Sequence, residues 1–377
     1  MKRFAVSATF ILFIWTIAFP QNPERDSTGI SLLFIGDIMG HDDQIRSALD
    51  TTKGAYCYDN VFQYVKGIIS EADIAIANLE VTLAGAPYRG YPAFSSPAAL
   101  AQSCRNAGID ILATANNHSA DRGKKGITGT IQRLDSLGIR HTGTFTGQRE
   151  KDSLQPLLIE SDSFRLALLN YTYGTNGIKV PVPVIVNMLV RDQVSADIAG
   201  ALRLDPDAVI LFLHWGTEYD TIPSADQEEL AEHFSQQGAR LIIGSHPHVI
   251  QKMVWEKSDT SGEERLIAYS LGNFVSNQRK QRTDGGLMLK IDLAKEAGSV
   301  FIADAGYYLT WVYTPVEDGK KKFYILPCSE FEDRPEFFSR REDYEKMLTF
   351  IVNSRKLLEA QNKGIGEIIF SEGRWLH

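Results

Sequence analysis

The sequence predicts an α/β fold in which parallel strands alternate with helices. Residues 208–213 and 241–243 are apolar runs typical of buried strands, and each leads into a loop that carries histidine. The segment between them has the pattern of a helix, because Ser224 and Gln227 form a capping box and Gly238 follows as a C-cap. This strand–helix–strand unit has the size of a βαβ crossover, which predicts that its two strands are parallel.

The other elements follow in order along the chain. Apolar runs predict strands at residues 31–37, 72–80 and 109–118. They also predict a strand with a glycine-rich exit within residues 164–177, and one strand followed by an asparagine-bearing loop within residues 265–277. Helices are predicted at residues 60–70, 97–107, 127–137 and 192–204; Ser96 caps the second of them, which has Pro97 at its first position and Gly108 after its end. Beyond residue 285 the pattern changes to antiparallel strands at 285–293, 299–313 and 321–327, followed by a helix over 335–361.

The N-terminal segment has the features of an export signal. Residues 1–20 join a basic start to a continuous apolar run, which predicts a signal peptide or a membrane anchor, and residues 21–29 form a polar linker. We expect export to the periplasm or cell envelope, with cleavage favoured over retention of the anchor. Residues 30–284 are predicted to form the main domain, and residues 285–377 to pack on that same domain as strands and a helix.

Composition excludes one class of partner. The formal net charge is −8, and the basic clusters are confined to Arg279–Arg282 and Lys320–Lys322, so a nucleic-acid binder is not expected. Cys57, Cys104 and Cys328 are scattered without C-x-x-C spacing, and their odd number argues against a disulfide framework.

Polar side chains end nearly every predicted strand. Taken singly, each has an ordinary structural explanation: Asp37 as a turn residue, Asn117 as a helix cap, His214 as a hydrogen-bonded core residue. Together they supply carboxylate, amide and imidazole groups, which suit Mn, Fe or Zn. Two such ions, some ~3.5–4 Å apart, would hold and activate a water for attack on an ester. The residues at these strand ends are Asp37, Glu80, Asn117, His118, His214, His246 and His248.

A family resemblance rests on an ordered set of motifs. The segments GDIM, ANLE, NNHSADRG, GTNG, HWGTEY, GSHPHVIQ and SLGNF, between Ser31 and Gln278, resemble those of the capsule-synthesis protein CapA family. That family is associated with poly-γ-glutamate and is related to the calcineurin-like metallophosphoesterases. The resemblance implies a metallophosphoesterase-like four-layer α/β/β/α sandwich with two mixed sheets and a small C-terminal addition.

The resemblance also implies roles for the strand-end residues. It implies one or two divalent metal ions, with Glu80 in the place of the metal-bridging carboxylate and His118 as the acid or charge-stabilising group. Asp121 lies one helical turn from His118 and is expected to orient its imidazole. The metal ligands implied are Asp37, Glu80, Asn117, His214, His246 and His248.

One departure from the related enzymes affects the metal count. Met39 stands where their GDxH motif has histidine, so one metal position lacks a nitrogen ligand. His41 follows two residues later and is either a substitute ligand or an exposed loop histidine, the second being the expected state. Both a one-metal and a two-metal site remain open.

Three further residues are candidates for substrate binding. Asn176 and Asn273 follow strands in glycine-containing turns, where each could orient a substrate or cap the turn. Arg89, between Tyr88 and Tyr91 on a predicted loop over residues 84–96, could contact an anionic polymer.

Two functions from different classes follow. The first is an exported metal-dependent hydrolase of phosphoester or amide bonds, linked to capsule or poly-γ-glutamate metabolism. The alternative is a non-catalytic accessory that binds, anchors or exports an anionic polymer such as poly-γ-glutamate, together with membrane-bound capsule machinery. Met39 favours the second, and the complete set of asparagine and histidine ligands favours the first. Neither a P-loop nor a nucleophile elbow is present, so any role in synthesis would be auxiliary.

Overall fold

The computed structural model describes residues 29–161, 163–257 and 264–377. The predicted signal peptide or anchor and nearly all of the predicted linker lie outside the described residues. Within the described part of the chain, no helix has the length and apolar character needed to cross a membrane.

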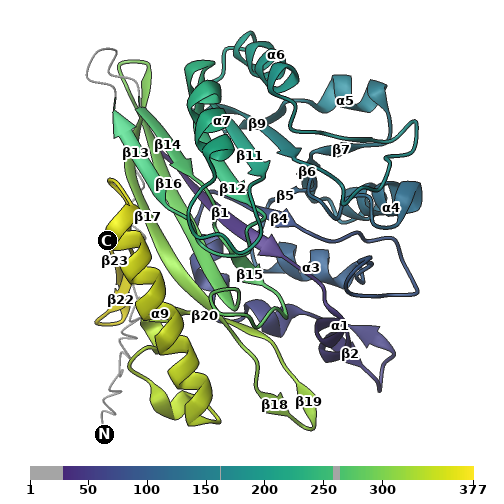
Figure 1. Cartoon of the computed structure of the whole chain (residues 1–377), viewed down its shortest axis with the longest axis vertical. Coiled ribbons are helices and arrows are strands. Elements are labelled where there is room, and N and C mark those ends of the chain that lie inside the picture. The colour runs from purple at the N-terminus through teal and green to yellow at the C-terminus, as the bar shows by residue number, and fades with distance from the viewer. Residues whose placement is uncertain (1–28, 162, 258–263) are drawn as a thin grey trace, which may run out of the picture.

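The first sheet is mixed and contains nine strands (Figure 1). Four neighbours are parallel: β1 (Gly29–Ile38), β4 (Ile74–Leu79), β5 (Ile111–Ala113) and β6 (Arg140–Thr142). On the other side of β1 the sheet continues with antiparallel strands: β16 (Gly285–Glu296), β17 (Ser299–Tyr313) and β20 (Tyr324–Pro327). The short β15 (Asn273–Val275) also pairs with β1, and β21 (Gly366–Glu367) pairs with β17. The chain after residue 284 therefore completes this sheet.

The second sheet has six strands in the order β13, β14, β12, β11, β9, β8. Its centre is parallel: β14 (Glu264–Ala268), β12 (Ala239–Ser245), β11 (Ala208–His214) and β9 (Arg165–Thr172). Its edges, β13 (Met253–Lys257) and β8 (Leu157–Glu160), are antiparallel to their neighbours. The predicted βαβ unit is confirmed, since β11 and β12 pair in parallel and are connected through α7 (Ala225–Gln236). Its capping box is present: Ser224 Oγ accepts from Gln227 N at 3.2 Å.

The two sheets face each other and helices cover their outer faces (Figure 1). Phe34 of β1 and Phe212 of β11 meet in the shared core, with ring centroids 6.4 Å apart. The outer face of the first sheet packs against α2 (Lys66–Glu71), α3 (Ala99–Asn106) and the end of α4 (Gly123–Ser136). The outer face of the second packs against α6 (Arg191–Leu202) and α7. The predicted four-layer α/β/β/α sandwich with two mixed sheets is confirmed.

The C-terminal helix α9 (Arg341–Gln361) joins the shared core beside the second sheet. Met347, Phe350, Ile351 and Leu358 of α9 belong to the same apolar cluster as the inner side chains of β17. The remaining elements are short: α1 (Asp42–Ala48), β2 (Leu49–Asp50), β3 (Ala55–Tyr56), η1 (Asp59–Phe62), β7 (Thr144–Phe145), α5 (Gln148–Leu154), β10 (Ile185–Val186), β18 (Val316–Glu317), β19 (Lys320–Lys321), α8 (Cys328–Phe331), η2 (Pro335–Phe337), β22 (Ile369–Ser371) and β23 (Arg374–Leu376).

Some predicted elements are wrong in extent. Residues 265–277 form two strands in different sheets, because the chain leaves β14 and crosses at Gly272 to pair with β1 as β15. The strand predicted at 109–118 stops at Ala113, since the following residues turn and Ser119 Oγ accepts from Asn116 N at 2.8 Å. The helix that Ser96 was expected to cap begins instead at Ala99. The helix predicted at 60–70 is split into η1 and α2.

Gly36 allows the close approach of β1 to this sheet-to-sheet crossing. Asp37 N donates to Gly272 O at 3.0 Å, and a Cβ atom on Gly36 would lie only 2.1 Å from that same carbonyl oxygen. No real side chain tolerates this separation from backbone, so either the crossing or the end of β1 would have to move.

We predict that Gly36→Ala lowers the free energy of unfolding by about 1–3 kcal/mol, the usual cost of overpacking a tight interior. Urea unfolding measures this difference in the free energy of unfolding. The matched control is Gly67→Ala in α2, where a Cβ would meet nothing within 4 Å. That variant should unfold like the parent protein or gain up to about 1 kcal/mol from helix propensity. Equal stability of the two variants would contradict the packing argument.

Candidate metal centre

The predicted ligands meet at the carboxyl ends of the central strands, the edge where α/β sheets place their ligands. Asp37 lies near the end of β1 and Glu80 follows β4 directly. His214 is the last residue of β11, and His246 and His248 follow β12. All five side chains are buried. The two sheets thus bring together residues that are far apart in the sequence.

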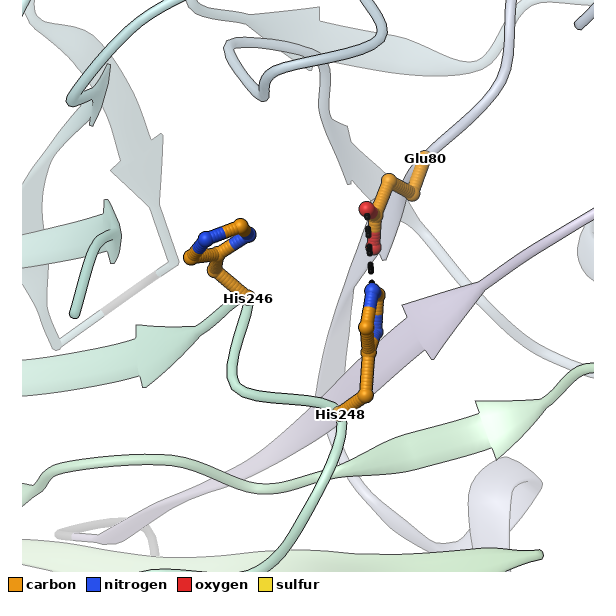
Figure 2. Close-up of side chains that lie close together, drawn as sticks. All are labelled: Glu80, His246 and His248. Atoms are coloured by element: carbon orange, nitrogen blue, oxygen red, sulfur yellow. Dashed lines mark ion pairs between the residues drawn. The ribbon is translucent and has the colours of Figure 1, made fainter. Parts of the chain in front are cut away.

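Glu80 is common to two groups of ligands. Glu80, His246 and His248 offer ligand atoms within 4.8 Å of one another, and so do Asp37, Glu80 and His214. Figure 2 shows the first group, in which the Glu80 carboxylate faces the ring of His248. Among the described residues, Glu80 is therefore the ligand candidate that both groups share.

The Glu80 carboxylate has no hydrogen bond from the described protein. Both oxygens are buried and unpartnered, and Oε1 lies 3.8 Å from His248 Nε2 and 3.7 Å from His214 Nε2. Burial raises the pKa of Glu80 well above its usual range, and the nearby Asp37 carboxylate raises it further. A buried carboxylate without partners is costly unless a cation compensates it. The residues present are therefore suited to hold a divalent ion.

His214 and His246 are held as neutral imidazoles, the form that binds metals. Burial lowers the pKa of His246 to about 3, and burial with the neighbouring His246 lowers the pKa of His214 well below its usual range. His246 Nδ1 is buried and has no hydrogen-bond partner among the described residues. The centroid of its ring lies 4.7 Å from that of His214 and 4.5 Å from that of Tyr173. His246 and His248 both have positive φ, 99° and 59°. Such strain is concentrated at functional sites.

Hydrogen bonds fix the direction of two rings. His214 Nδ1 lies 2.9 Å from Ser245 Oγ, which turns Nε2 toward Asn117 Oδ1 at 3.0 Å. His248 Nδ1 lies 3.1 Å from Asp37 Oδ2, which leaves Nε2 toward Glu80. Polar partners of this kind set the tautomer and orientation of metal-binding histidines.

Two asparagines that the sequence reasoning missed connect the strand ends. Asn78 Nδ2 donates to Asp37 Oδ1 at 2.8 Å, and Asn116 Nδ2 donates to Leu79 O at 2.8 Å and to Asn78 Oδ1 at 3.3 Å. Both side chains are fully buried. Their signal in the sequence was an amide inside an otherwise apolar strand, in ANLE, and a second asparagine in NNH, because a buried amide needs partners.

His118 is oriented as the spacing predicted. Its Nδ1 lies 2.8 Å from Asp121 Oδ2, which also accepts from Phe94 N at 2.7 Å. The Phe94 ring packs edge-on against the imidazole, with centroids 4.7 Å apart. Asn116 Oδ1 accepts from the His118 backbone N at 3.1 Å. The imidazole is thus held by Asp121 and Phe94, and the backbone of His118 by Asn116, with Nε2 outside the Asp121 contact.

Met39, which stands where the GDxH motif has histidine, packs among apolar side chains. Met39 is buried in the cluster between the first sheet and its helices. The expectation that His41 is an exposed loop histidine is wrong: its Nδ1 lies 3.1 Å from Gln44 Oε1 and accepts from Asn277 N at 3.2 Å. Burial lowers its pKa to about 4. His41 precedes α1 as its N-cap and belongs to neither ligand group among the described residues.

The three substrate-binding candidates lie in different surroundings. Asn176 Oδ1 accepts from Asn117 Nδ2 at 3.3 Å, which places Asn176 beside the metal centre. Asn273 is fully buried, and its Nδ2 donates to Thr283 O at 2.8 Å and to Gln278 Oε1 at 3.0 Å, so it anchors a loop. Arg89 is exposed on the loop over residues 84–96, where its backbone pairs with Ser95.

Comparison with known proteins gives related chains. A family model described as "Bacterial capsule synthesis protein PGA_cap" matches residues 31–278. The capsule biosynthesis protein CapA of Bacillus anthracis is 28% identical over 280 residues, which cover 71% of this chain and 65% of that protein. The PGA biosynthesis protein CapA of Bacillus subtilis strain 168 is 26% identical over 323 residues, 79% of this chain and 78% of that protein. The chain thus spans just under two thirds of the Bacillus anthracis relative.

Two solved structures align with this chain over most of its length. The NAD nucleotidase of Haemophilus influenzae aligns with a TM-score of 0.48 at 13% identity, over 92% of this chain and 65% of that one. The calcineurin-like phosphoesterase YfkN of Bacillus subtilis aligns with a TM-score of 0.47 at 14% identity, over 88% and 98%. The sequence match extends from β1 through every predicted metal ligand and covers more than half of the chain. The chain therefore belongs to the bacterial capsule synthesis protein PGA_cap family.

Proposed function

We propose that the protein is a metal-dependent hydrolase that cleaves a phosphoester or amide bond in capsule or poly-γ-glutamate metabolism. The observation that carries the proposal is Glu80, a buried carboxylate shared by two ligand groups and without a hydrogen bond from the described protein. A carboxylate in this state is a strong ligand for a cation and a poor structural residue.

The ligand set defines what the centre would bind. Asp37, Glu80 and Asn117 offer oxygen, and the three histidines offer nitrogen, a mixture suited to Mn, Fe or Zn. The chemistry that a divalent ion supplies at such a site is Lewis acidity toward the scissile group and a lowered pKa for water. The chain's own contribution is to keep the imidazoles of His214 and His246 neutral and to exclude bulk water from the buried ligands.

His118 is the candidate acid for the leaving group. Its Nδ1 is engaged by Asp121, so Nε2 is the nitrogen that exchanges a proton with the substrate. Asp121 acts as the positioning residue, and its second contact with Phe94 N keeps the carboxylate in place.

A second function is favoured by Met39. Without a histidine at this position, one side of the centre has fewer ligands, and a site of this kind could bind an anionic polymer without cleaving it. The protein would then be an accessory that holds or exports such a polymer beside membrane-bound capsule machinery. A location in the periplasm or cell envelope is part of both proposals, and so is a possible N-terminal anchor.

The first prediction concerns metal content. Protein purified without chelator should contain one or two equivalents of Mn, Fe or Zn, and Glu80→Gln should lose nearly all of it, because the amide cannot neutralise a cation. Elemental analysis by plasma mass spectrometry measures it. The matched control is Glu359→Gln on the exposed side of α9, which should keep the metal. A parent protein that binds no metal even after reconstitution would rule out the hydrolase.

The second prediction concerns proton transfer. In metal-loaded protein, His118→Gln should lower kcat for a generic phosphodiester such as bis(p-nitrophenyl) phosphate about 10²-fold or more, with metal content unchanged. Asp121→Asn should lower kcat less, because His118 itself remains. Unchanged turnover in His118→Gln would remove its assigned role. A parent protein that is loaded with metal, binds polyglutamate and turns over no phosphodiester or peptide would establish the accessory function instead.

A further inference from the structure

One basic cluster of the sequence and one lysine of the other line a single surface cavity. Its volume is about 800 Å³, and its walls come from the loop between β15 and β16, the β18–β19 hairpin and α9. The loop contributes Arg279, Lys280 and Arg282, and the hairpin contributes Lys321. These residues are some 40 positions apart in a chain whose net charge is −8. The fold therefore concentrates positive charge at one place on an acidic protein.

The cavity also contains acidic side chains, but most of them are already engaged. Asp343 binds Arg340 through two hydrogen bonds of 2.7 and 2.9 Å. Asp284 accepts from Trp311 Nε1 at 2.8 Å, and Glu345 accepts from Arg341. The acidic groups on α9 thus neutralise mainly the basic groups of α9 itself.

The loop cations are not neutralised in this way. Among the described residues, Arg279, Lys280 and Arg282 form no ion pair with a carboxylate, and Arg282 Nε is buried without a hydrogen-bond partner. Arg279 has a structural role, since its guanidinium donates to Val312 O at 3.1 Å and to Ser276 O at 3.0 Å. Lys280 and Arg282 are therefore the groups available to a ligand, and they select an anion.

The cationic wall adjoins the metal centre. Lys280 Nζ lies 3.9 Å from the centroid of the Tyr219 ring, whose centroid is 6.2 Å from that of the His248 ring. The same loop is fixed by Asn273, whose amide binds Thr283 O and which pairs with Asp37 across β1 and β15. One wall of the cavity and one metal ligand are thus attached to the same pair of strands.

We propose that this cavity binds a polyanionic chain and presents one of its bonds to the metal centre. The positive groups come from several positions of the loop and from Lys321 of the hairpin, which also pairs with Asp43. Several cations along one wall suit repeated anionic groups better than a single small ion. Trp311 and Phe350 line the cavity and offer apolar contact to the backbone between such groups. The ligand chemistry is a flexible chain that carries a carboxylate or phosphate on each repeat. This inference rests on the proposed function only for the step at the metal centre.

The test is binding of fluorescently labelled oligomers of about ten units, measured by anisotropy in the presence of chelator so that no cleavage occurs. The three probes are oligo-γ-glutamate, polyphosphate and the neutral oligo-glutamine. At least one polyanion should bind more tightly than the neutral oligomer. Its affinity should fall as salt is raised, because salt screens exposed charges. The polyanion that binds with the higher affinity shows whether the repeating group is a carboxylate or a phosphate. Equal binding of all three probes would overturn the proposal.

Two double variants each remove two positive charges, one pair at the cavity and the other pair on α4. Lys280→Gln/Arg282→Gln should weaken polyanion binding at least about fivefold, as expected for the loss of two partly exposed charge contacts. Lys124→Gln/Lys125→Gln, which removes two exposed lysines of α4, should bind like the parent protein. Equal affinity of the two double variants would overturn the assignment of the cavity, provided that both unfold at the parent's urea concentration.

A third variant separates this inference from the hydrolase proposal. His246→Ala/His248→Ala should lose metal and still bind the polyanion, since the cavity does not need the ligands. If the parent protein loads metal and cleaves a phosphodiester but binds no polyanion, the cavity assignment fails and the hydrolase stands. If it binds the polyanion through Lys280 and Arg282 but holds no metal, the hydrolase fails and the cavity stands.

Discussion

A carboxylate that receives no hydrogen bond from the described residues, buried where two sheets meet, is the constraint on which the centre of this protein depends. Glu80 is fully enclosed, and the nearest basic atoms are imidazole nitrogens more than 3.5 Å away. Burial of such a group opposes folding unless a proton or a cation neutralises it. Burial and the nearby Asp37 carboxylate both raise the pKa of Glu80. A proton and a cation would therefore compete for the same oxygen atoms.

Hydrogen bonds among the surrounding polar groups hold the strand ends around Glu80 in place. Asp37 receives a hydrogen bond from Asn78, which in turn receives one from Asn116. Asn116 also accepts from the backbone of His118. A continuous set of bonds therefore runs from one carboxylate to the candidate acid through three neighbouring strand ends. Fully satisfied networks of this kind define one arrangement of a buried polar region, whereas incomplete ones do not.

Much of the fold and of the candidate metal centre could be predicted from the sequence, because the signals are local. Apolar strands that end in Asp, Glu, Asn or His are local patterns, and parallel pairing then brings the ends together, as with β11 and β12. The contacts that depend on tertiary structure were not accessible. The crossing at Gly272 divides one apolar run between two sheets, which periodicity cannot reveal. The burial of His41 depends on Asn277 and Phe94, neither of which is near it in the sequence.

The position of β1 in the sheet affects the order in which the protein folds. This strand carries Asp37, yet on one side it pairs with β15 and β16, and Asp37 contacts His248, which is 211 residues later in the chain. Contacts of such long range are slow to form because a large loop must close first. A ribosome-bound chain that ends before β16 would have β1 with an unpaired edge. The centre is therefore a late product of folding, and the family match, which stops at residue 278, ends before the strands that complete the sheet around it.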